Sequence, residues 1–186
     1  MTHLGWPHDL MTLSEFEELP EDNSRHVELQ DGVLYVTPHL GDAHDKAVDR
    51  LTGELTAQLP PGFEAVQRRT VVTWTAFPPS VRKPDIVVVP KGSPSQVQSH
   101  QVMLAVEVAA TGSRAVDTLA KPFDYARAGI RHYWVVDRSL TEYRLGEDGS
   151  YQKAPAAAGT FTTTEPFPFT MDLTGLPATE EGDSDL

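Results

Sequence analysis

Two short runs rich in β-branched residues constrain the fold more than any other feature. The runs Lys83-Pro84-Asp85-Ile86-Val87-Val88-Val89 and Leu104-Ala105-Val106-Glu107-Val108 are typical of buried strands. Each run carries one carboxylate where an apolar residue is expected, Asp85 in the first and Glu107 in the second. Because burying an unpaired carboxylate costs several kcal/mol, we expect the two carboxylates to be paired or to coordinate a metal ion.

The two carboxylates suit a divalent cation. Mg²⁺ and Mn²⁺ bind carboxylate oxygens and keep several waters, and such an ion polarises a phosphodiester and lowers the pKa of an attacking water. Lys121 follows Glu107 by fourteen residues, on an expected helix, where its ammonium would orient the nucleophile or stabilise developing charge. A structural interpretation stays open: Asp85 enters a strand, Glu107 pairs with an arginine, and Lys121 pairs with Asp117 at i−4.

The remaining pattern predicts an α+β or mixed α/β domain with helices packed against the sheet. Asp31-Gly32 between two alternating runs predicts a hairpin over 25–36. Apolar periodicity predicts helices over 12–19, 42–59 and 115–128, the last closed by Gly129. Further strands are expected at 63–67, 70–74, 132–137, 141–145 and 151–154, with a polar loop over 91–101. His44, in the first turn of the second helix, is interpreted as a cap or solvent-facing residue, with a site role as the alternative.

Length and composition limit the class of protein. We expect a single domain over 1–178 and an acidic, disordered tail over 179–186. The sequence has no run of eighteen apolar residues, so we expect no membrane span. Its first residues do not form a basic stretch followed by an apolar one, so we expect no signal peptide. The chain has no cysteine, which excludes disulfides, thiolate metal sites and cysteine nucleophiles and fits a cytoplasmic location.

The charge balance bears on the partner. The net charge of −12 argues against nucleic acid. Residues 65–92, however, carry five basic residues against the single acid Asp85, so a locally basic face is expected near the proposed site.

The ordered motifs resemble a known family. They are Arg25-His26-Val27-Glu28-Leu29-Gln30-Asp31-Gly32, His44 opening a helix, Lys83-Pro84-Asp85-Ile86, Val106-Glu107-Val108, Asp117, Lys121, Tyr125, Gly129 and Tyr133-Trp134-Val135-Val136-Asp137. In order and spacing they resemble the Uma-type restriction endonuclease family, a branch of the PD-(D/E)xK nuclease superfamily, over residues 12–175. The resemblance implies a restriction-endonuclease-like mixed central sheet flanked by helices. It also implies Asp85 and Glu107 as ligands of Mg²⁺ or Mn²⁺, Lys121 as the catalytic lysine, and Glu28 as a third acid near the site.

The chain departs from the superfamily pattern in two ways that concern the lysine. The superfamily motif has its lysine two residues after the acid, where this chain has Ala109, so the lysine must come from the following helix. Pro122 directly follows Lys121, and a proline there marks a late helix start or a kink. Residues 110–113, Ala-Thr-Gly-Ser, replace a Ser-Pro-Ser-Thr-like loop of the relatives.

Three functional hypotheses follow. The first is a metal-dependent endonuclease that hydrolyses DNA phosphodiester bonds, with DNA preferred to RNA as substrate. The second is a catalytically inactive, nuclease-like module that binds nucleic acid or protein, which Ala109, Pro122 and the acidic balance favour. The third is an oligomerisation domain without a site. The exposed hairpins and the aromatic content (Trp74, Tyr133, Trp134 and Tyr143) also leave room for a homodimer, which would suit the cutting of two strands.

Overall fold

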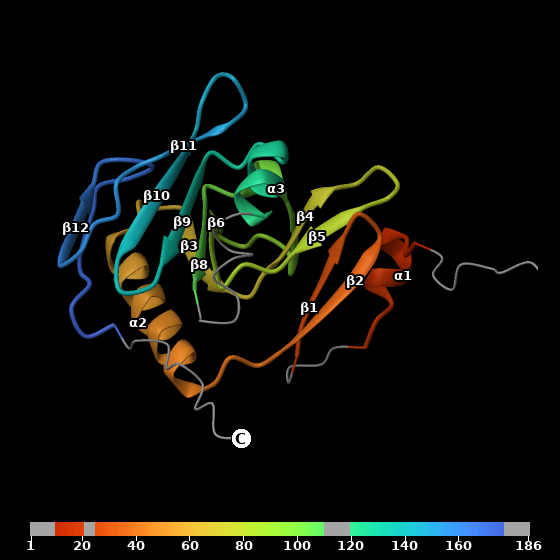
Figure 1. Cartoon of the computed structure of the whole chain (residues 1–186), viewed down its shortest axis with the longest axis horizontal. Coiled ribbons are helices and arrows are strands. Elements are labelled where there is room, and N and C mark those ends of the chain that lie inside the picture. Colours follow the sequence, from red (N-terminus) through yellow and green to blue (C-terminus); the bar gives the residue numbers. More distant parts are fainter. Residues whose placement is uncertain (1–9, 21–24, 110–119, 177–186) are drawn as a thin grey trace, which may run out of the picture.

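The centre of the molecule is a six-stranded mixed sheet (Figure 1). The structure is a computed structural model that describes residues 10–20, 25–109 and 120–176. The strands of this sheet, in spatial order, are β11 (Tyr151–Lys153), β10 (Leu140–Leu145), β9 (His132–Val136), β8 (Leu104–Val108), β6 (Ile86–Pro90) and β3 (Phe63–Gln67). The neighbours β8 and β9 are parallel, and the other neighbouring pairs are antiparallel.

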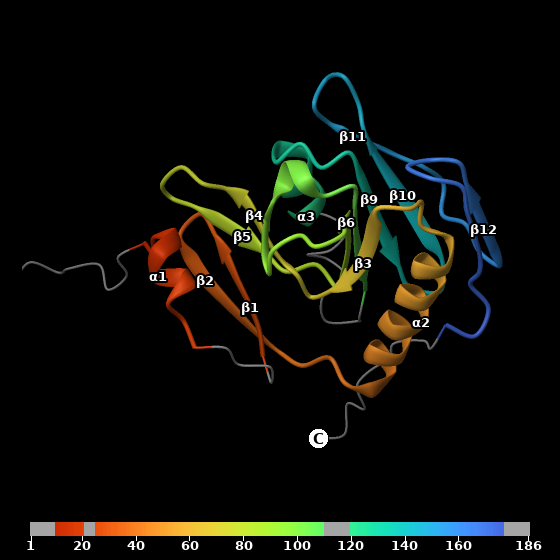
Figure 2. The ribbon, with the colours of Figure 1, turned by 180° about the vertical axis from the view of Figure 1, so that it is seen from behind.

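One face of the central sheet is covered by α2 (Asp42–Gln58) (Figures 1 and 2). Apolar residues one helical turn apart, including Ala47, Leu51 and Leu55, form the buried stripe that periodicity predicts. They belong to one core cluster with Val106 and Trp134 of the sheet. A small sheet of β12 (Thr160–Thr163) and β13 (Phe169–Asp172) completes this core, since its phenylalanines pack against the Trp134 ring.

The other face is covered by α3 (Lys121–Arg127) and by a second sheet. The strands of the second sheet, in spatial order, are β2 (Val33–Pro38), β1 (Arg25–Gln30), β5 (Ser80–Arg82), β4 (Thr70–Trp74) and β7 (Gln96–Gln98). Val71 and Val97 of this sheet share a core cluster with Tyr125 of α3 and with Val87 and Ala105 of the central sheet. The short helix α1 (Leu13–Glu17) lies within the expected helix over 12–19 and begins with a capping box of Thr12 and Glu15.

The predicted fold class is confirmed, with two local corrections. The expected polar loop over 91–101 was wrong, because it contains β7 and the 3₁₀ helix η1 (Ser99–Gln101). Strand β5, which begins at Ser80, was not among the expected strands either. Both strands were missed because they are only three residues long and too short to show a period. The first part of the expected helix over 115–128 and the expected tail over 179–186 lie outside the described residues.

The end of α3 agrees with the sequence pattern. Gly129 has φ of 77°, the left-handed conformation expected after a helix C-terminus. Of the helices in the described ranges, none is long and apolar enough to cross a membrane.

The core on the α2 face yields a stability prediction. Leu51 is fully buried, so Leu51→Ala should lower the free energy of unfolding by about 2–5 kcal/mol through lost burial and the cavity left behind. Lys46→Ala, on the exposed side of the same helix, should change it by no more than about 0.5 kcal/mol. Urea denaturation followed by circular dichroism measures both. Equal effects of the two variants would contradict the assigned packing of α2.

Candidate functional site

The register of two central strands sets the positions of the two predicted acids. β6 and β8 are antiparallel, with Ile86 opposite Val106. Continued by one residue, this register places Asp85 directly opposite Glu107. Cross-strand neighbours in such a pair have Cβ atoms about 4.5–5.5 Å apart. Both carboxylates are buried, with 6% and 2% of their surface exposed, so the sheet brings together two like charges away from water.

Asp85 is held by a histidine and by a backbone amide. His44, in the first turn of α2, has its Nε2 3.3 Å from Oδ2 of Asp85. The amide of Val108 donates to the same oxygen over 2.8 Å. Burial raises the pKa of Asp85, but the hydrogen bond and charge of His44, the charge of Lys121 and the Val108 amide together lower it below its usual value. Asp85 is therefore ionised in the folded protein near neutral pH.

The interpretation of His44 as a cap or solvent-facing residue was wrong. His44 is 3% exposed and contacts Asp85. Burial lowers the pKa of His44, but the hydrogen bond and charge of Asp85 outweigh that effect, and the pKa is raised. A sequence signal for this burial was present, because His44 lies three residues before Ala47 and seven before Leu51, on the apolar stripe of α2.

Glu107 is paired with Lys121 and with a tyrosine. Nζ of Lys121 lies 2.9 Å from Oε1 of Glu107, and the hydroxyl of Tyr125 donates to the same oxygen over 2.8 Å. Burial and the charges of Glu107 and Glu28 raise the pKa of Tyr125 well above its ordinary value, so the hydroxyl keeps its proton. The described part of the α-helix runs from Lys121, with Pro122 in its first turn; residues 110–119, which would separate a late helix start from a kink, lie outside the described residues. The alternative partner of Lys121, Asp117, lies outside the described residues.

Glu28 belongs to the same group of charges, held by different partners. Its Oε2 accepts from Arg82 over 2.9 Å, and its Oε1 accepts from the amide of Lys83 over 2.9 Å and faces His26 at 3.3 Å. Burial raises the pKa of Glu28, but the charge of Lys121, the hydrogen bond from His26 and the charge of Arg82 lower it far below its ordinary value. Both oxygens of Glu28 are thus engaged, which makes it an anchor for Arg82.

Arg82 joins three elements around the site, and the sequence interpretation missed it. It is 2% exposed and forms ion pairs with Glu28 of β1 and Asp124 of α3. The two pairs fasten α3, which carries Lys121 and Tyr125, to the second sheet. The apolar neighbour Val81 was a weak signal that Arg82 is buried. The run Ser80-Val81-Arg82 is only three residues long, which is too short to show which side chains face the core.

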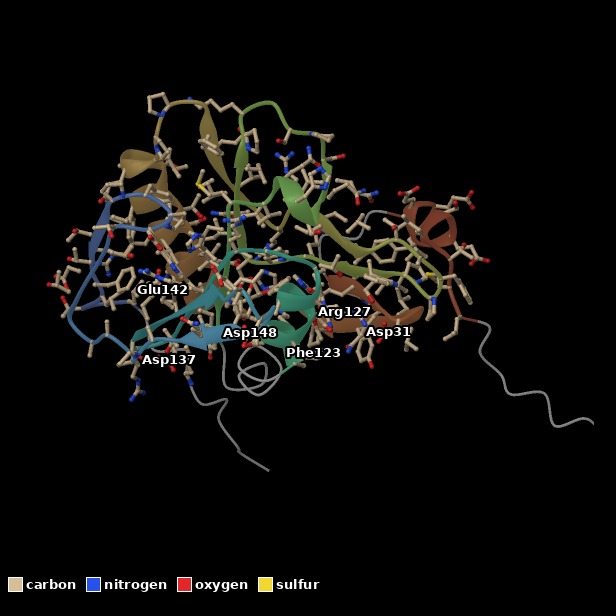
Figure 3. All side chains as sticks on the ribbon, turned by 90° about the horizontal axis from the view of Figure 1, so that it is seen from above. Asp31, Phe123, Arg127, Asp137, Glu142 and Asp148 are labelled. Carbon is tan, nitrogen blue, oxygen red and sulfur yellow. The ribbon has the colours of Figure 1, made fainter. Side chains whose placement is uncertain are left out.

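A second contact between α3 and the hairpin lies at the surface. Arg127 pairs with Asp31 in the β1–β2 turn at 3.3 Å and stacks over the Trp74 ring at 5.1 Å. Figure 3 shows Asp31 and Arg127 beside each other, with Phe123 also on α3. These groups are exposed, so the contact adds little stability. Like the Arg82 ion pairs, it joins α3 to the second sheet.

The donor set fits a hard divalent cation bound through two carboxylates. Asp85 and Glu107 supply oxygen ligands, and Mg²⁺ commonly takes one or two carboxylates together with waters. Within the described ranges, no three His, Cys, Asp or Glu side chains are grouped as a metal cluster. The role of Asp85 and Glu107 as metal ligands therefore stays a prediction, as do the catalytic roles of Lys121 and Glu28.

Comparison with known proteins gives the family. Residues 13–175 match the model of the Uma2 family, described as "Putative restriction endonuclease". The chain belongs to the Uma2 family. The resemblance seen in the ordered motifs is confirmed. None of the curated proteins matches the chain.

A solved structure agrees with the fold. The crystal structure of a "putative nuclease belonging to DUF820" from Anabaena variabilis superposes with a TM-score of 0.68 at 14% identity, covering 89% of this chain and 97% of that chain. At that identity the likeness concerns the fold alone. It places this Uma2 chain on the restriction-endonuclease-like scaffold that the motifs implied.

The Arg82 ion pairs yield a stability prediction. Arg82→Met leaves Glu28 and Asp124 buried without their cation, so the free energy of unfolding should fall by about 3–5 kcal/mol. The triple variant Arg82→Met, Glu28→Gln, Asp124→Asn removes the uncompensated charges and should recover part of that loss. Urea denaturation at neutral pH measures both variants. A triple variant less stable than Arg82→Met would refute the assigned pairing.

The lowered pKa of Glu28 predicts an acid-dependent loss of stability. A carboxylate whose folded pKa lies below its unfolded value of about 4.3 stabilises the protein above that pH, and the contribution fades as the pH falls further. As the pH is lowered from about 5 to about 3, the free energy of unfolding should therefore fall less for Glu28→Gln than for the wild type. Urea titrations across this range provide the measurement. Parallel curves for the two proteins would show that Glu28 is not stabilised as an anion.

Proposed function

We propose that this protein is a Mg²⁺- or Mn²⁺-dependent endonuclease that hydrolyses DNA phosphodiester bonds. The observation that carries the proposal is the buried group of Asp85, Glu107 and Lys121 at the paired ends of β6 and β8. Membership of a family described as "Putative restriction endonuclease" supports a nuclease, and the word restriction favours DNA over RNA as substrate.

In this proposal Asp85 and Glu107 hold the cation. Once bound, the ion would polarise the scissile phosphate and lower the pKa of an attacking water. The protein's part is to hold each carboxylate in a fixed orientation. His44 and the Val108 amide do so for Asp85 and also lower its pKa, and Tyr125 holds Glu107 by a hydrogen bond. Second partners of this kind fix the direction of a ligand oxygen before the ion arrives.

Lys121 is the proposed positioning cation for the reacting groups. Its ammonium lies 2.9 Å from Oε1 of Glu107, beside the face where the phosphate would bind. A lysine there can donate hydrogen bonds to the attacking water and to the phosphoryl oxygens as negative charge develops on them. Arg82, through Asp124, keeps the helix that carries Lys121 against the second sheet, so the lysine approaches the acids from a fixed direction.

The charge distribution sets conditions on binding. A protein of net charge −12 gains little from general attraction to DNA, so binding should depend on local cations and on the bound metal ion. We place the activity in the cytoplasm on the basis of the cysteine-free sequence.

Cleavage assays test the catalytic assignment. Supercoiled plasmid incubated with Mg²⁺ or Mn²⁺ should be nicked or cut, and Asp85→Asn, Glu107→Gln and Lys121→Met should each reduce the rate at least about 100-fold, since removing one transition-state donor alone costs that much. Glu142→Gln is a matched control: it is a buried carboxylate paired with Arg144, and Figure 3 shows it away from α3. Cleavage unchanged in the Asp85 and Glu107 variants would refute the site.

Metal binding separates the enzyme from an inactive, nuclease-like binding module. Calorimetric titration of the wild type with Mn²⁺ should show binding that Asp85→Asn and Glu107→Gln weaken at least about tenfold, because each removes one anionic ligand. Glu142→Gln should bind as the wild type does. No binding at millimolar Mn²⁺, together with retained DNA binding in a gel-shift assay, would favour the inactive module.

A further inference from the structure

Strand β2 is an edge strand with an uncharged, apolar sequence. It ends the order β2-β1-β5-β4-β7, so no strand lies on its outer side in the described part of the chain. Its sequence, Val-Leu-Tyr-Val-Thr-Pro, has no charged residue in a chain of net charge −12. Val33, Tyr35 and Val36 are 47%, 49% and 46% exposed. Charged side chains are one of the devices that keep the edge strands of monomeric proteins from pairing, and β2 carries none.

Helix α1 covers a face of this sheet and leaves the outer edge of β2 open. Leu13 and Phe16 pack against the cluster that Leu29, Val72 and Val81 form on one face. Glu17 of α1 accepts a hydrogen bond from Gln96, which belongs to β7 at the opposite edge of the sheet. The helix thus runs across the strands. The hairpin itself projects from the body of the molecule (Figures 1 and 2), and Val33, Tyr35 and Val36 of β2 are half-exposed.

The turn geometry shows which backbone groups of β2 point outward. Asp31 and Gly32 both have positive φ, 47° and 77°, as in a two-residue type I′ turn closed by Gln30 and Val33. The closing pair of such a hairpin is hydrogen-bonded, and bonded pairs alternate along the strands. The N–H and C=O groups of Val33, Tyr35 and Thr37 therefore point to β1, and those of Leu34 and Val36 point outward.

We propose that β2 pairs antiparallel with β2 of a second copy of this chain. Pro38 has no N–H, so a symmetric pairing centred on Val36 would leave one bond of each Leu34–Pro38 pair unmade. A pairing centred on Tyr35 places Leu34 opposite the second copy's Val36, and all four outward N–H and C=O groups of each strand are satisfied. The absence of charge on β2 means that no like-charge repulsion opposes contact between identical strands.

This pairing gives the dimer a defined arrangement. The two-fold axis passes between the two Tyr35 residues, perpendicular to the sheet, and joins the two five-stranded sheets into one. Because the axis is perpendicular to the sheet, the equivalent faces of the two five-stranded sheets lie on the same side of the joined sheet. Tyr35 lies opposite Glu28, so both Glu28–Arg82 anchors, and the two sites they border, open on one side of the joined sheet. If the proposed function holds, the two sites face one duplex.

The chain is suited to cross-linking because it has no cysteine. In the Tyr35-centred register, Tyr35 faces its own copy across a non-hydrogen-bonded pair with Cα atoms about 4.5 Å apart, within disulfide range. Tyr35→Cys should therefore form a disulfide dimer under mild oxidation. The single variants Val33→Cys and Thr37→Cys should not form a disulfide dimer, because position 33 of one copy lies opposite position 37 of the other. The double variant Val33→Cys, Thr37→Cys should form one. Equal cross-linking of all single variants would overturn the register.

Sedimentation of the full chain tests the interface without any activity assay, so its outcome is independent of the nuclease proposal. The wild type at about 50 μM should sediment as a dimer, with twice the chain mass of 20.4 kDa. Val36→Pro removes an outward N–H that the hairpin does not use, and it should give a monomer with unchanged circular dichroism. Tyr35→Lys, at an exposed position, should do the same if Val36→Pro does not fold. A monomeric wild type, or a dimer that survives in a folded variant, would overturn the proposal.

Discussion

The site depends on compensating buried charge. The antiparallel register of β6 and β8 forces Asp85 and Glu107 together, and two anions at that separation away from water repel strongly. The fold tolerates them because Lys121 contacts Glu107 and His44 contacts Asp85. These two partners come from helices on different sides of the sheet, so both acids have their partners only once both helices are packed. Folding and assembly of the site are thus the same event.

The second sheet explains why the lysine arrives from a helix. Tyr125 packs into the core between the two sheets and reaches Glu107 with its hydroxyl, while Asp124 on the same helix binds Arg82 of β5. A seven-residue helix has little stability of its own. Its apolar contact and its ion pair hold it at two points, and Lys121 in its first turn is directed to the acids as a result.

The elements with a strong local signal could be predicted from sequence, and the contacts that join them could not. The sequence alone predicted the Asp31-Gly32 hairpin, the apolar stripe of α2 and the strands β6 and β8. It also predicted that the two acids of those strands lie close together. The burial of Arg82 was not predicted, because a three-residue strand has no period and the packing of distant elements decides which way its side chains point. The orientation of His44 was misread although the residue lies on the α2 stripe. The contact of Lys121 with Glu107 depends on how α3 packs against the central sheet, which no local pattern shows.

The ion pairs that share Arg82 limit which substitutions the protein can accept during evolution. Arg82 pairs with two acids at once, so replacing the arginine leaves two buried carboxylates without their cation, whereas replacing one acid leaves a single ion pair. The arginine is therefore the member of the group that is least free to change. A relative that differs at Asp85 or Glu107 should still be recognisable by a buried arginine between two carboxylates.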